Sequence, residues 1–282
     1  MPSKFICAIL FSLCFANNSF GATLKDLPYG IDKAQALDVY LPDTELANRP
    51  IVFIVHGGAW RIGDKTNHSV IKTKVRRWVK QGWVVVSVNY RLIPAADPYT
   101  QAEDVATALA YVQNHSAEWG ADASKIILMG HSSGAHLVSL LATDKALGEK
   151  FSLKPILGSV WLDSAALDVT EIMQNPHSRF YDKAFGDSAD YWRKVSAIEH
   201  LHKDVQPIAL ICSSQRDDSC PQSQALADKA TQLAVRTNII TVDLSHHQIN
   251  ATLGDNTAYT WQVEDFMRSL DPALNAYLKP TP

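Results

Sequence analysis

Short apolar runs alternate with amphipathic stretches along most of this chain. Runs rich in β-branched residues, typical of buried strands, occupy 51–55, 83–89, 125–129, 156–162, 208–212 and 238–244. Between them, apolar residues recur at helical spacing, as at Val105, Leu109 and Val112. Near-continuous apolar strands that alternate with helices predict an α/β fold with a mostly parallel central sheet and helices on both faces. An earlier segment, 35–42, has the pattern of an edge strand.

The pentapeptide Gly130-His131-Ser132-Ser133-Gly134 joins a predicted strand directly to a predicted helix. It fits the pattern G-x-S-x-G, in which the middle serine occupies a sharp strand-to-helix turn that exposes its hydroxyl as a nucleophile. Glycines are expected there because side chains would collide with the neighbouring strand and helix. Ser132 is therefore the candidate nucleophile. The amide of Ser133, at the helix start, is a candidate donor to a developing oxyanion.

A serine nucleophile also needs further oxyanion donors, and the segment HGGAW at 56–60 follows the strand 51–55. Consecutive small residues after a strand leave backbone N–H groups free to face a substrate oxygen. We expect the amides of Gly58 and Ala59 to act as donors. Structural roles are expected for His56 and Trp60, which flank the loop.

The acid of a catalytic triad is expected after a later strand. The strand 208–212 is followed by SSQRDDSCP, in which Asp217 lies four residues before Pro221, the residue that opens the next helix. Asp217 is therefore the expected acid. Asp218 and Asp163, which ends an earlier strand, are the alternatives.

The base is expected last in the chain. The strand 238–244 is followed by SHHQIN, and His246 precedes Ile249, an apolar residue that can anchor the loop. His246 is the expected base, and His247 is its alternative. The histidines lack metal-ligand spacing, and no glycine-rich loop suited to phosphate precedes a helix, so we expect no metal and no cofactor.

The N-terminal segment has a different character. Lys4 precedes the apolar run FICAILFSLCFA, and small residues precede a possible cut after Gly21 or Ala22. This pattern predicts a secretory signal peptide over 1–22, followed by a single domain over 23–282. The apolar run is short for a membrane span, so we expect a secreted or periplasmic protein without stable membrane insertion.

Cleavage of that segment leaves two cysteines, Cys212 and Cys220. In an oxidising compartment two such cysteines often pair, and a bridge here would brace the loop that contains Asp217. The alternative is one buried thiol in a strand and one free thiol in a loop.

A polar and aromatic stretch at 163–205 interrupts the strand–helix rhythm. Insertions at this point can cover the edge of a sheet where ligands bind, so the stretch is a candidate cap; a plain surface excursion is the alternative. Its aromatic residues are expected to narrow the entrance above Ser132 and to favour short acyl chains. They are Phe180, Tyr181, Phe185, Tyr191 and Trp192.

The charge pattern restricts the partners. The formal net charge is -3, which gives no electrostatic reason to expect nucleic acid binding. The basic stretch KTKVRRWVK at 72–80 is expected to be the solvated face of a helix, with contact to an acidic polymer as the alternative.

Taken together, the motifs resemble the α/β-hydrolase superfamily. The segments HGGAW, VSVNYRL, GHSSGAHL and KAFG resemble most closely the small esterases related to bacterial feruloyl and acetyl esterases and to kynurenine formamidase. The resemblance covers nearly the whole chain after residue 22, although Ala59 stands where many relatives have Gly or Tyr.

The resemblance implies a triad of Ser132, Asp217 and His246 that hydrolyses a small-molecule ester through an acyl-enzyme. An arylformamidase using the same residues is the alternative. A non-catalytic α/β-hydrolase that serves as a binding module is an alternative of another class. The acyl group, the alcohol and the oligomeric state stay open.

Overall fold

The computed structural model describes residues 21–43 and 47–279. The predicted signal peptide therefore lies outside the described residues, except for Gly21 and Ala22. Among the helices of the described ranges, none has the length and apolar character needed to cross a membrane.

A single eight-stranded sheet forms the centre of the described chain, in the order β1-β2-β4-β3-β5-β6-β7-β8. Its strands are β1 (Thr23–Pro28), β2 (Ala36–Tyr40), β3 (Arg49–Val55), β4 (Val84–Val88), β5 (Ala121–His131), β6 (Gly158–Leu162), β7 (Ile208–Ser213) and β8 (Thr237–Val242). Strands β3 to β8 pair in parallel, whereas β2 pairs antiparallel with β1 and with β4. The mostly parallel sheet confirms the predicted fold class.

Helices follow most of the parallel strands, as their alternation in the sequence predicts. The α-helices are α1 (His68–Trp78), α2 (Pro98–His115), α3 (Ser133–Thr143), α4 (Lys145–Lys150), α5 (Val169–Gln174), α6 (Arg179–Phe185), α7 (Ala189–Lys194), α8 (Ser219–Gln232), α9 (His246–Thr252) and α10 (Ala258–Arg268). Three short 3₁₀ helices are η1 (Ser116–Trp119), η2 (Ala197–His200) and η3 (Pro272–Ala276).

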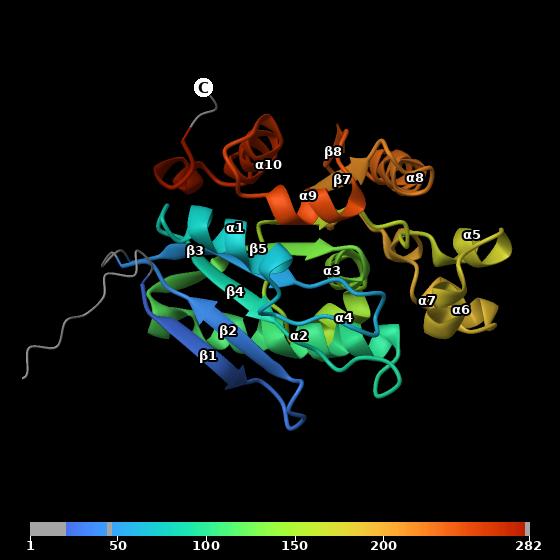
Figure 1. Ribbon diagram of the computed structural model, residues 1–282, viewed down its shortest axis with the longest axis horizontal. Coiled ribbons are helices and arrows are strands. Elements are labelled where there is room, and N and C mark those ends of the chain that lie inside the picture. Colours follow the sequence, from blue (N-terminus) through green and yellow to red (C-terminus); the bar gives the residue numbers. More distant parts are fainter. Residues whose placement is uncertain (1–20, 44–46, 280–282) are drawn as a thin grey trace, which may run out of the picture.

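Two hydrophobic cores cover the two faces of the sheet, and the central strand β3 shows why. Its residues Ile51, Phe53 and Val55 pack in the core that contains α2 and α3. The alternate residues Val52 and Ile54 pack in the core that contains α1 and α10. Successive side chains of a strand point to opposite faces, so a strand buried on both sides is apolar at every position. Figure 1 shows α1 and α10 on one side of the sheet and α2 on the other.

The register of the sheet brings the ends of its central strands together at one edge. Val55 at the end of β3 pairs with Gly130 in β5. His131, the next residue of β5, pairs with Leu162 at the end of β6. The segments that follow these strands are therefore neighbours, which is the edge where parallel α/β sheets bind ligands.

Helix α1 contains most of the basic stretch 72–80, but its basic side chains are not all solvated. Lys74 is fully buried, and its ammonium group lies 2.5 Å from the carbonyl oxygen of Asn250. Arg77 is ion-paired with Glu264 of α10 at 2.5 Å. The expectation of a solvated helix face is therefore wrong for these two residues. Both face α9 and α10, partners that lie far away in the sequence.

The stretch 163–205 folds into short helices. They are α5, α6, α7 and η2, and Figure 1 shows α5, α6 and α7 grouped at one end of the molecule. Tyr181 and Phe185 of α6 are buried in the same core as α2 and α3. The insertion is thus anchored to the domain by aromatic side chains.

Candidate active site

Ser132 occupies the turn between β5 and α3, in a backbone conformation that few residues adopt. Its φ is 56° and its ψ is -123°, outside the regions favoured by residues with a side chain. A Cβ atom at Gly134 would lie 2.4 Å from the carbonyl oxygens of Val55 and His56, and one at Gly130 would lie 2.3 Å from the oxygen of Gly134. The collisions expected from the sequence are therefore present. The strained turn keeps Ser132 at the surface of a cavity, at the N-terminus of α3.

The loop after β3 presents unoccupied amides beside this serine. Gly58 and Ala59 both have positive φ, of 137° and 50°. Within the described part of the chain, no hydrogen bond occupies the amides of Gly58, Ala59 or Ser133. All three residues line the cavity that also contains Ser132. Free amides at a helix N-terminus and in a tight loop are the usual means of holding an oxyanion.

His56 and Trp60 form the framework of that loop. The His56 ring stacks on Tyr90 with a centroid separation of 4.5 Å, and the Tyr90 hydroxyl donates to the His56 carbonyl oxygen at 2.8 Å. Burial lowers the pKa of His56, which keeps its ring neutral. Trp60 is buried, and its indole N–H donates to His136 Nδ1 at 3.2 Å. These contacts fit the structural roles predicted for His56 and Trp60.

His246 is the first residue of α9, and its position is fixed by a capping box. The Ser245 side chain accepts from the Gln248 amide, and the Gln248 side chain accepts from the Ser245 amide. His246 Nδ1 lies 2.6 Å from Asp163 Oδ2. The neighbouring His247 also borders the cavity but is exposed. The structure therefore gives the carboxylate contact to His246, the residue favoured by the sequence.

The acid paired with His246 is Asp163, not Asp217, and this corrects the sequence-based expectation. Asp163 follows β6 directly, has a φ of 54° and is fully buried. Its Oδ1 accepts from the Ser219 hydroxyl at 2.6 Å and from the Ser213 amide at 2.9 Å, which leaves Oδ2 to face His246.

The hydrogen bonds to Asp163 determine its charge. Burial by itself raises the pKa of the Asp163 carboxyl group, but hydrogen bonds from His246, Ser219 and the Ser213 amide outweigh burial, and the charge of Arg216 adds to them. The pKa of Asp163 is held well below its ordinary range. The carboxylate is therefore ionised at neutral pH, as a residue that orients and stabilises an imidazolium must be.

Asp217 and Asp218 lie on the outer side of the β7–α8 loop. Asp217 is exposed and borders a separate cavity of about 490 Å³. Asp218 is ion-paired with Arg216 at 2.9 Å. The physical reason is that Arg216 and Ser219 both turn inward to Asp163, so the two residues between them turn outward.

The candidate catalytic residues line one cavity of about 550 Å³. Ser132, Asp163, Arg216 and His246 border it, together with the loop after β3. Of the aromatic residues in the 163–205 stretch, Phe180 and Tyr181 also border it.

The other aromatic residues of the insertion have different contacts. Phe185 packs against Trp60, with its ring centroid 4.8 Å from that of Trp60. The Tyr191 hydroxyl donates to Asp97 at 2.6 Å, and the Trp192 indole N–H donates to the Gly186 carbonyl oxygen at 3.0 Å. Of the five residues expected to narrow the entrance, Phe180 and Tyr181 of α6 border the cavity, whereas the other three have these contacts elsewhere.

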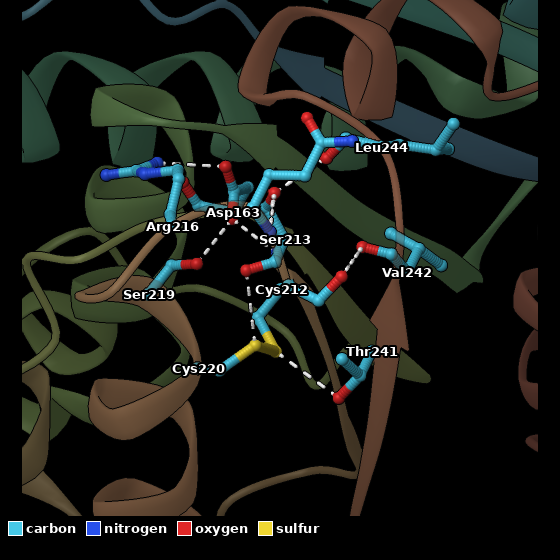
Figure 2. The surroundings of a disulfide bond; sticks show 11 residues. Asp163, Cys212, Ser213, Arg216, Ser219, Cys220, Thr241, Val242 and Leu244 are labelled. Atoms are coloured by element: carbon cyan, nitrogen blue, oxygen red, sulfur yellow. Dashed lines mark hydrogen bonds and ion pairs between the residues drawn. A yellow bond between two sulfur atoms is a disulfide. The ribbon is translucent and has the colours of Figure 1, made fainter.

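A disulfide joins Cys212 in β7 to Cys220 in α8, with a Cα–Cα distance of 5.1 Å. This decides between the two alternatives left open by the sequence. Figure 2 shows the bridge at the base of the loop that carries Arg216, close to the group formed by Asp163, Ser213 and Ser219. The bridge therefore braces the segment that contacts the acid.

The sheet order and the nucleophile elbow define an α/β-hydrolase, as the sequence predicts. The BD-FAE family model matches residues 37–230, which is more than half of the chain. The protein therefore belongs to the BD-FAE family.

Individual relatives agree with this assignment. Esterase LipQ of Mycobacterium tuberculosis is 29% identical over 226 residues, covering 75% of this chain and 53% of the relative. Kynurenine formamidase of Danio rerio is 31% identical over 153 residues, covering 54% of this chain and 48% of the relative. The chain thus spans about half the length of these curated relatives.

Solved structures share the fold over most of the chain. A truncated carbohydrate esterase from gut microbiota superposes with a TM-score of 0.74 at 20% identity, covering 90% of this chain and 98% of the other. Esterase B from Lactobacillus rhamnosus has a TM-score of 0.72 at 23% identity, covering 92% and 88%. At such low identity these likenesses show the fold.

Proposed function

We propose that this protein is a serine esterase with a triad of Ser132, His246 and Asp163. The observation that carries the proposal is that one cavity is bordered by a serine in a strained elbow and by a histidine hydrogen-bonded to a buried carboxylate. Nucleophile, base and orienting acid recur in this relationship on unrelated folds that catalyse acyl transfer.

The chemistry follows from these positions. Ser132 attacks the acyl carbonyl carbon while His246 Nε2 takes the hydroxyl proton. Asp163, ionised and buried, holds the Nδ1–H tautomer and stabilises the imidazolium. The amides of Gly58, Ala59 and Ser133 stabilise the oxyanion of the tetrahedral intermediate.

The same groups complete acylation and then carry out deacylation. The imidazolium of His246 gives its proton to the leaving alcohol, which departs as the acyl-enzyme forms. A water molecule then attacks the acyl carbon and gives a proton to His246. When this second tetrahedral intermediate collapses, the bond between the acyl carbon and Ser132 Oγ breaks, and His246 returns the proton to Oγ. The product is a carboxylic acid, and no cofactor takes part.

We further propose a preference for short acyl chains. The aromatic rings of Trp60 and Tyr181 lie 6.0 Å apart and both border the cavity with Ser132, so they limit the room next to the reacting carbon. Phe180 adds a ring that is 39% exposed at the cavity rim. A long aliphatic chain would need an extended apolar surface, which the charged stretch 163–205 does not offer.

We also propose that the protein is exported. Residues 1–22 have the pattern of a signal peptide, and β1 begins at Thr23, so a cut after Gly21 or Ala22 leaves the sheet intact. The Cys212–Cys220 disulfide fits an oxidising compartment. N-terminal sequencing of protein recovered from the periplasm or the medium tests this directly, and a retained Met1 contradicts it.

The activity is tested with chromogenic acyl esters of graded length, run beside N-formylkynurenine and a feruloylated sugar. We expect kcat/KM to be higher for acetyl and propionyl esters than for dodecanoyl esters, and Ser132→Ala to abolish hydrolysis. Ser133→Ala is the matched control, since it keeps the amide that faces the oxyanion. Activity in Ser132→Ala, or hydrolysis of the formamide alone, contradicts the esterase assignment; no hydrolysis at all favours a binding module.

A further inference from the structure

The guanidinium group of Arg216 lies between the proposed acid and the proposed base. Its Nη1 is 2.8 Å from Asp163 Oδ2 and 2.7 Å from His246 Nδ1. Its Nη2 is 2.9 Å from Asp218 Oδ2. The side chain is 24% exposed and borders the cavity that contains Ser132. The proposed triad of Ser132, His246 and Asp163 does not by itself include this cation.

Two hydrogen-bond arrangements compete at His246 Nδ1. If Nδ1 carries the proton, it donates to Asp163, and the lone pair on Nε2 is free to take the proton of Ser132. If Nδ1 is unprotonated, it accepts from Arg216, and Nε2 then carries the proton and is not a base. Asp163 Oδ2 accepts from both neighbours, so Arg216 and His246 converge on the same oxygen.

The doubly protonated ring interacts with Arg216 in another way. An imidazolium is a donor at both nitrogens and carries a positive charge, whereas Arg216 is a donor and is always charged. With Nη1 and Nδ1 only 2.7 Å apart, the two cations repel each other, and part of the attraction of Asp163 is cancelled. The guanidinium group therefore opposes a positive charge on the His246 ring, which Asp163 by itself would favour.

We propose that Arg216 is a positioning residue for the reaction: its guanidinium group fixes Asp163 Oδ2, the oxygen that must draw the proton onto His246 Nδ1, and its charge opposes a second positive charge beside that nitrogen. The proposal rests on the esterase function proposed above. Its consequence is that Arg216 acts on the reaction through Asp163 and His246.

The other titratable and charged groups around His246 do not replace Arg216. From the end of β5, His131 packs its ring 4.4 Å from that of His246 and donates from Nε2 to the His246 carbonyl oxygen at 2.9 Å. Burial, followed by the charge of His246, lowers the pKa of His131 to about 3, so its ring is neutral.

On the other side of α9, Lys74 of α1 reaches Asn250 and not the His246 ring. Tyr259 of α10 donates to the Ile249 carbonyl oxygen at 3.0 Å, and His247 is exposed. The contacts to the His246 Nδ1 atom thus come from one carboxylate, Asp163, and one guanidinium, Arg216.

The test is the pH dependence of kcat/KM for p-nitrophenyl acetate, corrected for background, in wild type, Arg216→Gln and Arg216→Lys. Arg216→Gln keeps a donor for Asp163 but loses the charge, so we expect the acid limb to move to higher pH by about one unit. Arg216→Lys keeps the charge but loses the planar guanidinium group that holds two carboxylates. We therefore expect the acid limb of the pH profile to stay near its wild-type position, and kcat to fall about tenfold with KM unchanged. Arg236→Gln is the matched control, because Arg236 hydrogen-bonds Ser269 on the far side of β8.

Each outcome decides the proposal. An acid limb in Arg216→Gln that coincides with wild type overturns the charge effect, even if kcat falls. Equal shifts in Arg216→Gln and Arg216→Lys also overturn it, because only one of them loses charge. Circular dichroism and thermal melts of both variants separate loss of fold from loss of rate, and Arg216→Met, which also removes the charge, takes the place of Arg216→Gln if that variant does not fold. Failure of the esterase proposal is distinct, since wild type would then match Ser132→Ala.

Discussion

The ammonium group of Lys74 lies 2.5 Å from the carbonyl oxygen of Asn250, in the helix whose first residue is His246. The same ammonium group lies 2.9 Å from the side-chain oxygen of Asn250. Thr73 donates to the Ala251 carbonyl oxygen at 3.1 Å, and Tyr259 donates to that of Ile249 at 3.0 Å. The last carbonyl groups of a helix lack partners within it, so α1 and α10 satisfy the C-terminus of α9.

Lys74→Met should remove a pH dependence of stability. Burial lowers the pKa of Lys74 to about 7, whereas an unfolded lysine titrates near about 10.4. Between these values the unfolded chain binds more protons, so raising the pH stabilises the fold. We expect the free energy of unfolding of wild type to rise by about 2 kcal/mol relative to Lys74→Met between pH 7 and pH 9.

Urea unfolding at the two pH values measures this difference. Lys72→Met is the matched control, because Lys72 is an exposed lysine in the same helix. Its unfolding free energy should follow the wild-type pH profile. Parallel profiles for wild type and Lys74→Met would show that the buried amine does not titrate in this range.

Asp163→Asn and Asp217→Asn should have opposite consequences for activity. Asp163→Asn removes the carboxylate that holds the Nδ1–H tautomer of His246, so we expect kcat/KM to fall by about 10³–10⁴-fold. Asp217 is exposed and away from His246, so Asp217→Asn should change kcat/KM by about twofold or less. Steady-state kinetics with a short acyl ester decides between the two carboxylates, and the reverse ranking would return the acid to Asp217.

The positions of the strands follow from local pattern, which is why the sequence predicts most of the sheet. Strand β1 does not stand out in the sequence because four of its six residues are threonine, lysine, aspartate and proline, all exposed, and its two leucines are only half-buried. The position of the strand-to-helix turn at Ser132 was predicted correctly. Its glycines and serine lie within five consecutive residues, so the pattern can be recognised without knowing any contact between distant segments.

The carboxylate that His246 contacts differs from the acid predicted from the sequence, because this pairing depends on contacts between segments far apart in the chain. Asp163 and Asp217 both follow parallel strands, and the distance of Asp217 from Pro221 is the usual one. Arg216 and Ser219 distinguish the two, because both turn inward and hydrogen-bond Asp163. Along the sequence they lie 53 and 56 positions from Asp163. The sequence feature that favoured Asp163 was its position directly after the strand, in the segment Leu162-Asp163-Ser164.

Gly134→Ala should destabilise the protein although it adds only a methyl group. The new Cβ would lie 2.4 Å from two backbone oxygens of β3 and its following residue, so α3 must move away from the sheet. We expect a loss of about 1–3 kcal/mol in the free energy of unfolding, together with reduced kcat.

Gly148→Ala provides the contrast in helix α4. A Cβ atom there would have open space, with nothing within 4 Å, so the substitution should stabilise by about 0.5–1 kcal/mol. Chemical denaturation of both variants gives the comparison. A tolerated Gly134→Ala would mean that the close approach of α3 to β3 is not required.

Replacing both disulfide cysteines by alanine should lower the free energy of unfolding by about 2–3 kcal/mol, the amount expected for closing a short loop. Dithiothreitol should have a similar effect on wild type and none on the double variant. Denaturation of the two proteins with and without reductant measures this, and a wild type indifferent to reductant would show that the bridge contributes little.

The separation of Asp163 from the β7–α8 loop bears on how homologous sequences are aligned and labelled. The distance to Pro221 near the start of α8 would select Asp217 as the acid. The hydrogen-bonded partner of His246 is instead Asp163, which directly follows β6. Where a homologue carries an aspartate at the end of β6 and an arginine in the later loop, the two positions should be read as a correlated pair. In this chain Asp217 is exposed and lies outside the Asp163–His246 pair, so its replacement leaves that pair intact.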